Sequence, residues 1–139
     1  MKQILPFLFC LFVSEAAQSS HLMGGQITAR LITGLTYEVT MTLYRDTYGI
    51  PMGTTETIQI ENADSLTPWT ASRSMPSVAI PFINATEEYV YLALVTFPRN
   101  GTFTISYSSC CRNAAILNGP GGGSSFYLHT TFDVDSANP

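Results

Sequence analysis

A strict alternation of apolar and polar residues is the feature that most limits how this chain can fold. Over residues 36–45, the side chains of Tyr37, Val39, Met41 and Leu43 are separated by threonine and glutamate residues. Successive side chains of a β-strand point to opposite faces, so a period of two predicts a strand that buries one face. The same period argues against an amphipathic helix over this stretch.

The alternation recurs along most of the chain, and no window has the spacing of an amphipathic helix. We predict seven strands, over residues 27–31, 36–45, 55–61, 76–83, 88–97, 102–108 and 126–134. Seven short strands separated by turns predict an all-β fold, an antiparallel β-sandwich of immunoglobulin-like build. Residues 66–75, which contain Trp69, lack the alternation and are predicted to form a loop or a short helical turn.

Two finer predictions concern residues 88–97. This segment is apolar on both faces, which is typical of a central strand covered on both sides. It is followed by Asn100-Gly101 and then by the alternating segment 102–108. Asn-Gly between two such segments is a strong hairpin signal, so we expect the two strands to pair.

The first twenty residues have the order of a secretory signal peptide. One cation, Lys2, precedes the apolar run 4–13, and small residues follow. The run is shorter than the roughly 20 apolar residues that a membrane-spanning helix needs. We predict that residues 1–20 are removed on export, and that residues 21–139 form one β-sandwich module outside the cell or at the cell surface.

The charge composition excludes several classes of function. The chain has 6 basic and 10 acidic residues, and its only lysine lies in the predicted signal peptide. A phosphate backbone requires many cationic contacts, so a nucleic-acid partner is not expected. Schiff-base chemistry requires a lysine, which residues 21–139 do not contain. No later apolar run has the length of a membrane span.

Residues that could carry catalysis are sparse. A Ser-His-Asp arrangement could be built from His129, Asp133 and a serine, but no nucleophile-elbow motif occurs. His129 is placed on the polar face of a strand, where a solvated or cross-strand role is the simpler interpretation. We therefore expect no catalytic residues, no cofactor and no enzyme activity.

The end of the last strand offers oxygen ligands for calcium. Asp133, Asp135 and Asn138 follow one another at short intervals, a pattern found where calcium stiffens junctions between extracellular modules. Glu87 and Glu88 would complete such a site if they lay at the same end of the module. The alternative is a solvated strand end whose polar residues cap a turn.

Cys110 and Cys111 are adjacent, and they are the only cysteines after residue 20. Cysteines of exported proteins are usually oxidised. The two could bond to each other, stay reduced, or bond to cysteines that this chain does not contain.

A polar cluster is predicted from two segments that are distant in sequence. Arg45 and Asp46 end one strand, and Arg112 and Asn113 follow the cysteine pair. The cluster could face a ligand, or it could form a buried ion pair that fixes the loop around the cysteines. We favour the structural role, because buried pairs of this kind mainly fix geometry.

Four aromatic residues could form a contact surface for a carbohydrate or a protein. They are Tyr44, Tyr48, Trp69 and Tyr127. The alternative use of these side chains, which we favour, is packing across neighbouring strands.

Four blocks of sequence, taken in order, resemble a known family. They are HLMGGQIT (21–28), YEVTMTLYRD (37–46), SSCCRNAAI (108–116) and SANP (136–139). Together they resemble the leading module of large secreted surface proteins of Bacteroidota, often described as gliding-motility-associated or adhesin-like. The resemblance spans residues 21–139.

The resemblance implies a non-catalytic module of a secreted or cell-surface protein, serving adhesion or envelope architecture. It implies that the chain is a fragment, the first domain of a longer protein that continues with further domains and a sorting domain for type IX secretion. The expected partners are those neighbouring domains and a surface glycan or protein. A second interpretation, from another class, is a carbohydrate-binding domain of a secreted enzyme system.

Two departures from the family concern cysteines. Thr47 stands where the family commonly has a cysteine, and another family cysteine follows the Asn-Pro at which this sequence stops. The resemblance therefore implies that Cys110 or Cys111 bonds a cysteine beyond Pro139, and that here the two are free or joined to each other.

Overall fold

The computed structural model describes residues 22–62, 65–74, 77–80, 83, 85–110 and 124–136. All its regular elements are strands. They are β1 (Leu22–Thr33), β2 (Thr36–Asp46), β3 (Thr55–Asn62), β4 (Ser65–Arg73), β5 (Val78–Ala79), β6 (Thr86–Thr96), β7 (Gly101–Ser109) and β8 (Phe126–Val134). Six of the seven predicted strands correspond to these elements over most of their length, so the all-β prediction is confirmed. The strand predicted over residues 76–83 is reduced to Val78–Ala79 among the described residues, and both of these residues are exposed. Within the described ranges, no helix is long and apolar enough to cross a membrane.

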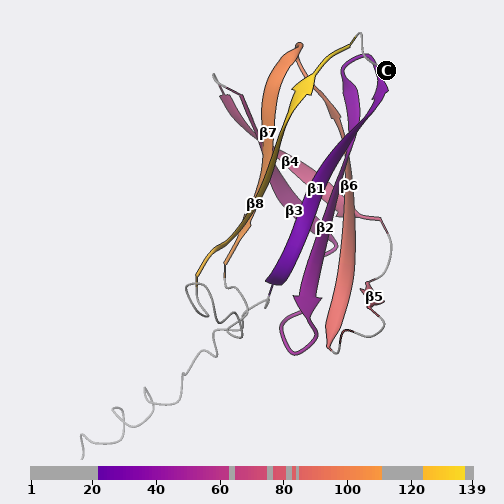
Figure 1. The fold of residues 1–139 in the computed structure, drawn as a ribbon, viewed down its shortest axis with the longest axis vertical. Helices are drawn as coiled ribbons and strands as arrows, with labels where there is room; N and C mark the ends of the chain where they lie inside the picture. Colours follow the sequence, from indigo (N-terminus) through magenta and orange to yellow (C-terminus); the bar gives the residue numbers. More distant parts are fainter. Residues whose placement is uncertain are drawn as a thin grey trace, which may run out of the picture.

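Hydrogen bonds join the strands into one antiparallel sheet, in the order β1-β2-β6-β4-β3-β7-β8 with β5 beside β6. This sheet folds into two layers (Figure 1). One layer contains β1, β2, β6 and β5, and the other contains β4, β3, β7 and β8. A short pairing of β4 with β6 connects the layers on one side, and on the other side β1 packs beside β8. The first, second and sixth strands lie in one layer, and the third, seventh and eighth lie in the other, which is the immunoglobulin-like arrangement. The predicted β-sandwich is therefore confirmed.

The core lies between the layers and is built from the alternating positions of each strand. Tyr37, Val39, Met41 and Leu43 of β2 are all buried, as their period predicted. From β6 the core receives Tyr89, Tyr91, Ala93 and Val95, and from β7 it receives Phe103, Ile105 and Tyr107. Each large apolar side chain buried in this way contributes about 1.5–3 kcal/mol relative to an exposed one.

The predicted hairpin at Asn100-Gly101 is wrong. β6 pairs with β2, β4 and β5, whereas β7 pairs with β3 and β8. The chain leaves the β6 ladder after Phe97, whose N–H donates to the Leu35 carbonyl at 2.9 Å. Pro98 comes next and has no amide hydrogen for a ladder bond. The turn therefore carries the chain from one layer to the other.

The prediction that residues 88–97 are covered on both faces is also wrong. The inward residues of β6 are buried, but the outward Leu94 is 63% exposed. Val90 and Leu92, which share this outward face, are only partly buried. The strand is central in its layer, yet the outer face of that layer carries exposed apolar side chains.

Residues 65–73 form strand β4 rather than the predicted loop or helical turn. The strand pairs with the whole of β3, from Thr55 opposite Ser72 to Asn62 opposite Ser65. Its inward positions carry Thr67, Trp69 and Ala71, so the apolar period that marks the other strands is weak here. Pairing with β3 outweighs the local sequence signal.

Candidate functional site

An opening in the described surface lies where β4 leaves β6. β4 pairs with β6 only through Ser72 opposite Leu92 and Arg73 opposite Tyr91. Beyond these pairs β4 continues along β3 in the other layer, so β4 and β6 diverge. We call the opening between residues 65–70 of β4 and residues 93–96 of β6 the notch.

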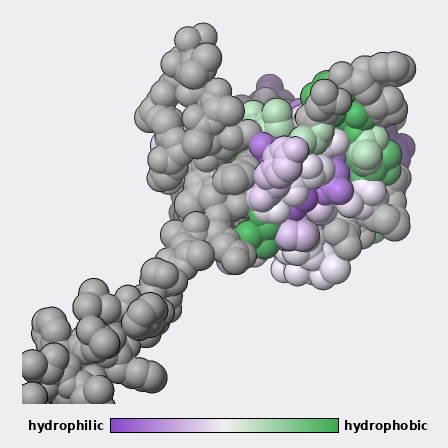
Figure 2. All heavy atoms as spheres, turned by 90° about the horizontal axis from the view of Figure 1, so that it is seen from below, coloured by the Kyte–Doolittle hydropathy of each residue, from purple (hydrophilic) through white to green (hydrophobic). Residues whose placement is uncertain are grey.

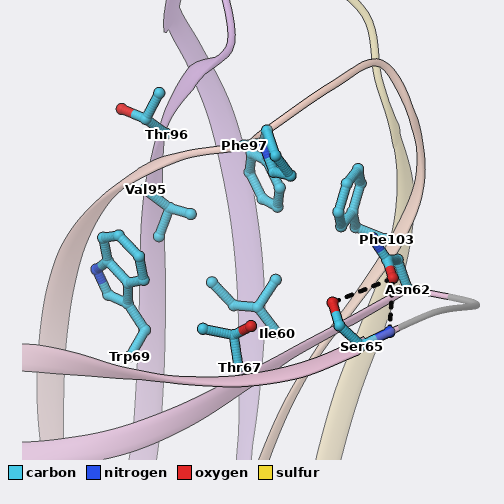
Figure 3. Close-up of a pocket in the computed structure, with 10 residues that line it drawn as sticks. Ile60, Asn62, Ser65, Thr67, Trp69, Val95, Thr96, Phe97 and Phe103 are labelled. Atoms are coloured by element: carbon cyan, nitrogen blue, oxygen red, sulfur yellow. Dashed lines mark hydrogen bonds between the residues drawn. The ribbon is translucent and has the colours of Figure 1, made fainter.

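A pocket of about 70 Å³ lies in the notch (Figure 3). Trp69 and Val95 stand together at one side of it, and Asn62 and Ser65 lie toward the other. Its remaining lining residues are Ile60, Thr67, Thr96, Phe97, Pro98 and Phe103. The volume is about half that of a cavity of 150 Å³ that holds benzene. The pocket therefore has the size of a branched aliphatic side chain.

The two polar groups at the end of the pocket are used within the fold. The Asn62 Oδ1 accepts a bond from the Ser65 N–H at 2.9 Å and one from the Ser65 hydroxyl at 3.3 Å. These bonds close the turn between β3 and β4, as an Asx turn does. A second pocket of about 200 Å³ adjoins here, lined by Asn62, Arg99, Asn100, Gly101, Thr102 and Phe103.

A wider hollow of about 370 Å³ lies on the outer face of the first layer, beside β5. Its lining is mostly apolar and consists of Met23, Gly24, Tyr44, Ile80, Ile83 and Thr86. The Thr86 hydroxyl is directed to the Met23 sulfur at 3.7 Å. A specific small-molecule site requires several polar groups that converge on the ligand. The described lining of this hollow does not supply them.

The four predicted contact aromatics do not form one surface. Tyr44 lies beside the wide hollow, and Tyr48 is exposed in the turn after β2. Tyr127 lies on the outer face of the other layer, where its ring is 5.4 Å from that of His129. Trp69 lines the pocket in the notch. The four residues therefore do not form the shared contact surface that we considered beside packing across strands, and Tyr48, at 85% exposed, does not have the packing role that we favoured.

The structure does not bring together the residues considered for catalysis. His129 and Asp133 are four residues apart on one face of β8, a separation of about 13 Å along a strand. The Asp133 Oδ1 accepts a hydrogen bond of 2.6 Å from the Thr102 hydroxyl. His129 stacks on Tyr127 instead.

Of the residues proposed for calcium, Asp133 and Asp135 lie at the end of the module where β2 begins. The Asp135 N–H donates to the Tyr37 hydroxyl at 3.1 Å, which fixes the end of β8 against β2. Among the described residues, no three His, Cys, Asp or Glu side chains are grouped closely enough to hold a metal ion. Asn138 lies outside the described residues, so calcium binding stays a prediction.

Glu87 and Glu88 lie at the opposite end and cannot complete that site. Glu87 faces Arg45, which is eight residues from Tyr37 along β2. Eight residues of strand span about 27 Å. The condition that the acidic residues share one end is therefore not met.

Arg45 forms a buried ion pair, but its partner is Glu87, which the sequence did not indicate. Its side chain is 4% exposed, and Nη2 lies 3.1 Å from the Glu87 Oε2. Nη1 donates to the Gly49 carbonyl at 3.0 Å, and Nη2 also contacts the Thr47 carbonyl at 3.4 Å. Its guanidinium lies 5.7 Å from the centre of the Tyr89 ring. Arg45 therefore holds the turn after β2 against the start of β6.

Other members of the predicted cluster lie elsewhere or outside the described residues. The Asp46 Oδ1 accepts a 3.0 Å bond from the Tyr48 N–H and so caps the same turn. Arg112, Asn113 and Cys111 lie outside the described residues. Cys110 is disulfide-bonded. Its pairing stays a prediction, as does the joint cluster of four residues.

The end that Arg45 occupies contains two further polar contacts that sequence reasoning missed. The Tyr107 hydroxyl donates to the Glu56 Oε2 at 3.1 Å, and the Tyr91 hydroxyl donates to the Gly53 carbonyl at 2.8 Å. Figure 2 looks onto this end and shows hydrophilic surface in its middle with separate hydrophobic patches around it. The sequence could have indicated Glu56, because it lies two residues before Ile58 and four before Ile60 and so shares their inward face of the strand.

Glu56 is expected to make stability fall as pH rises. Partial burial raises the pKa of its carboxyl, although the Tyr107 hydroxyl and the Gly53 backbone lower that pKa in part. Because this pKa is higher in the folded protein, the unfolded chain loses the proton first as pH rises. The stability that Glu56 contributes is therefore complete below about pH 4.5 and is lost as pH rises through the folded-state pKa. We predict that Glu56→Gln loses less stability than wild type between pH 4 and pH 7. The measurement is the free energy of unfolding by urea of both proteins at each pH. A difference that does not change with pH would contradict the prediction.

Comparison with known proteins identifies no relative. No family model matches the chain, and no curated protein or solved structure matches it significantly. The functional proposals below therefore depend on the sequence, the fold and the notch.

Proposed function

We propose that this chain is a non-catalytic extracellular β-sandwich module of a secreted or cell-surface protein, serving adhesion or envelope architecture. The observation that carries the proposal is how the buried polar side chains are used. Arg45, Tyr37, Tyr91 and Tyr107 each bind main-chain groups or a neighbouring carboxylate and hold loops in place. A rigid sandwich whose buried polar groups fix its loops suits a load-bearing or ligand-presenting module.

Three further observations support this proposal. The first twenty residues have the order of a signal peptide, and the four sequence blocks resemble secreted surface proteins. The candidate triad residues His129 and Asp133 lie far apart on one strand. The small pocket in the notch and the wide hollow beside β5 are lined mostly by apolar side chains, as binding surfaces are.

Export can be tested by expressing the full chain with a C-terminal tag in a Bacteroidota host. We expect the tagged protein in the medium or at the surface of intact cells, with its amino terminus at or near residue 21. A matched control, Leu8→Arg, interrupts the apolar run and should leave the full-length chain inside the cell. Cytoplasmic wild-type protein that retains Met1 would contradict the proposal.

One observation favours the alternative, a carbohydrate-binding domain of a secreted enzyme system. Trp69 lines a pocket whose rim carries Asn62, Ser65, Thr67 and Thr96, and sugars are commonly held by an aromatic ring and such polar groups. A glycan array would detect this binding. Loss of the signal in Trp69→Leu, with Tyr127→Leu unchanged, would support this alternative and place the glycan in the notch.

A further inference from the structure

We propose that the notch is an acceptor site for a β-strand of another polypeptide, which pairs with the free edge of β6 and inserts a branched aliphatic side chain into the Trp69 pocket. The proposal concerns the notch alone and does not require the module to be extracellular. It goes beyond the proposed function because it assigns both the surface and the chemistry of the partner.

The first support is the direction of the main-chain groups of β6. Main-chain groups of alternate residues in an antiparallel strand face opposite neighbours. The Phe97 N–H donates to Leu35 before β2, whereas the Val90 carbonyl accepts from Ser74 after β4. Since the register from Thr86 to Thr96 has no shift, the amides and carbonyls of Leu94 and Thr96 face the notch.

Those groups have no partner strand among the described residues. β4 pairs with β6 no further than Leu92, and β5 pairs with β6 only at Glu87 and Glu88. Leu94 and Thr96 therefore present two donors and two acceptors at a strand edge, which is what strand addition uses.

The facing edge of β4 is less suited to accept a strand. The Ser74 N–H is directed to β6, so the main-chain groups of even-numbered residues in β4 face the notch. Pro68 is one of these, and it supplies no N–H. This proline interrupts the donors on the β4 edge. The edge of β6 contains no proline, so we assign the incoming strand to β6.

The side chains around the notch match such a strand on both of its faces. A residue opposite Val95 would point inward to the pocket, because cross-strand neighbours share a face. Its two neighbours would point outward, opposite Leu94 and Thr96, and Leu94 is 63% exposed. An uncharged strand with a valine or leucine at the inward position would cover Leu94 and fill a pocket of about 70 Å³.

The probe for a direct test is an acetylated and amidated pentapeptide, Ser-Thr-Val-Leu-Thr, added to the uniformly ¹⁵N-labelled module. We expect slower hydrogen exchange at the Leu94 and Thr96 amides by about tenfold or more at saturation. Two control peptides separate backbone pairing from apolar adhesion. One has aspartate in place of valine, and the other carries N-methyl groups on the residues that flank the valine. Both should bind about tenfold more weakly or worse.

Matched variants test the pocket. Thr67→Phe places a bulky ring at the pocket wall and should weaken peptide binding about tenfold. Thr28→Phe makes the same change on the exposed outer face of β1 and should leave binding within about twofold. Thermal unfolding of both variants verifies that they fold. If Thr67→Phe does not fold, the proposal is decided by two other measurements. They are the slowing of hydrogen exchange at the Leu94 and Thr96 amides and the binding of the N-methylated peptide.

Several results would overturn the proposal. They are absence of peptide binding, binding that N-methylation leaves unchanged, and protection that appears on β1 or β8 instead of β6. Self-association of the free module that Thr67→Phe abolishes would assign the notch to a second copy. Glycan binding that Thr67→Phe abolishes, without peptide binding, would assign the notch to a sugar.

Discussion

Replacing Arg45 with methionine is expected to lower the free energy of unfolding by about 3–5 kcal/mol, the range for breaking one partner of a buried ion pair. The guanidinium contacts the Glu87 carboxylate and two main-chain carbonyls, of Thr47 and Gly49. Methionine fills much of the same volume but donates no hydrogen bond. A domain of this size has about 5–15 kcal/mol of stability in total, so the loss is a large part of it.

The matched control is Arg30→Met, which breaks an exposed ion pair with Glu38. Arg30 contacts Glu38 at 3.0 Å, close to the 3.1 Å of the Arg45 pair, so distance does not separate them. The side chains of Arg30 and Glu38 are 70% and 31% exposed, whereas those of Arg45 and Glu87 are 4% and 26% exposed. An exposed pair is worth about 0–1 kcal/mol. Equal losses in the two variants would show that burial does not set the value of Arg45.

The double variant Arg45→Met/Glu87→Gln separates the charge from the packing. Without Arg45, the Glu87 carboxylate keeps the hydrogen bond of 3.1 Å from the Tyr89 hydroxyl but has lost its cation. If that uncompensated charge causes much of the loss, removing it should restore about 1–2 kcal/mol relative to Arg45→Met alone. The Nε of Arg45 is buried without a hydrogen-bond partner, so the wild-type arginine already carries a desolvation cost. Urea unfolding of the four proteins completes the cycle. No restoration in the double variant would assign the loss to the turn carbonyls of Thr47 and Gly49.

Strands were predictable in this chain because burial on one face leaves a period of two that can be read locally. The pattern over residues 36–45 required no knowledge of neighbours, and β2 runs from Thr36 to Asp46. β4 was not predictable in this way, because its inward positions include the polar Thr67 beside Trp69 and so do not form an apolar series. Its strand conformation depends on pairing with β3, a long-range cause that one segment does not reveal.

The candidate site was less predictable because it depends on which strands are neighbours. Arg45 meets Glu87 only because β2 and β6 pair in one register. The notch exists because β4 pairs with β3 over its whole length and with β6 only at Ser72 and Arg73, and the alternation of residues 65–73 does not reveal this difference. Trp69 could be selected as a contact residue from its type alone, but its pocket requires Val95 and Phe97 from another layer.

Gly25→Ala is expected to destabilise the module by about 2–3 kcal/mol, the upper part of the range for overpacking. A Cβ atom at Gly25 would lie 2.5 Å from the Thr42 carbonyl oxygen, 3.0 Å from the Leu43 Cδ2 and 3.2 Å from the Leu128 Cδ2. The first of these atoms belongs to the main chain of β2, so a side-chain rotation cannot relieve the contact. β1 would have to move away from β2, and its packing beside β8 would loosen.

The neighbouring Gly24→Ala supplies the control, because no atom lies within 4 Å of a Cβ at that position. Replacing a glycine where there is space reduces the entropy of the unfolded chain, so Gly24→Ala should change stability by no more than about 1 kcal/mol, in the stabilising direction. Thermal and urea unfolding of the two variants therefore compare one added methyl group at adjacent positions of one strand. Equal stabilities would mean that β1 does not approach β2 as closely as the contact with Thr42 requires. A loss of stability in Gly25→Ala alone would show why residue 25 is a glycine: β1 and β2 approach closely there, and the flexibility of glycine is not the reason.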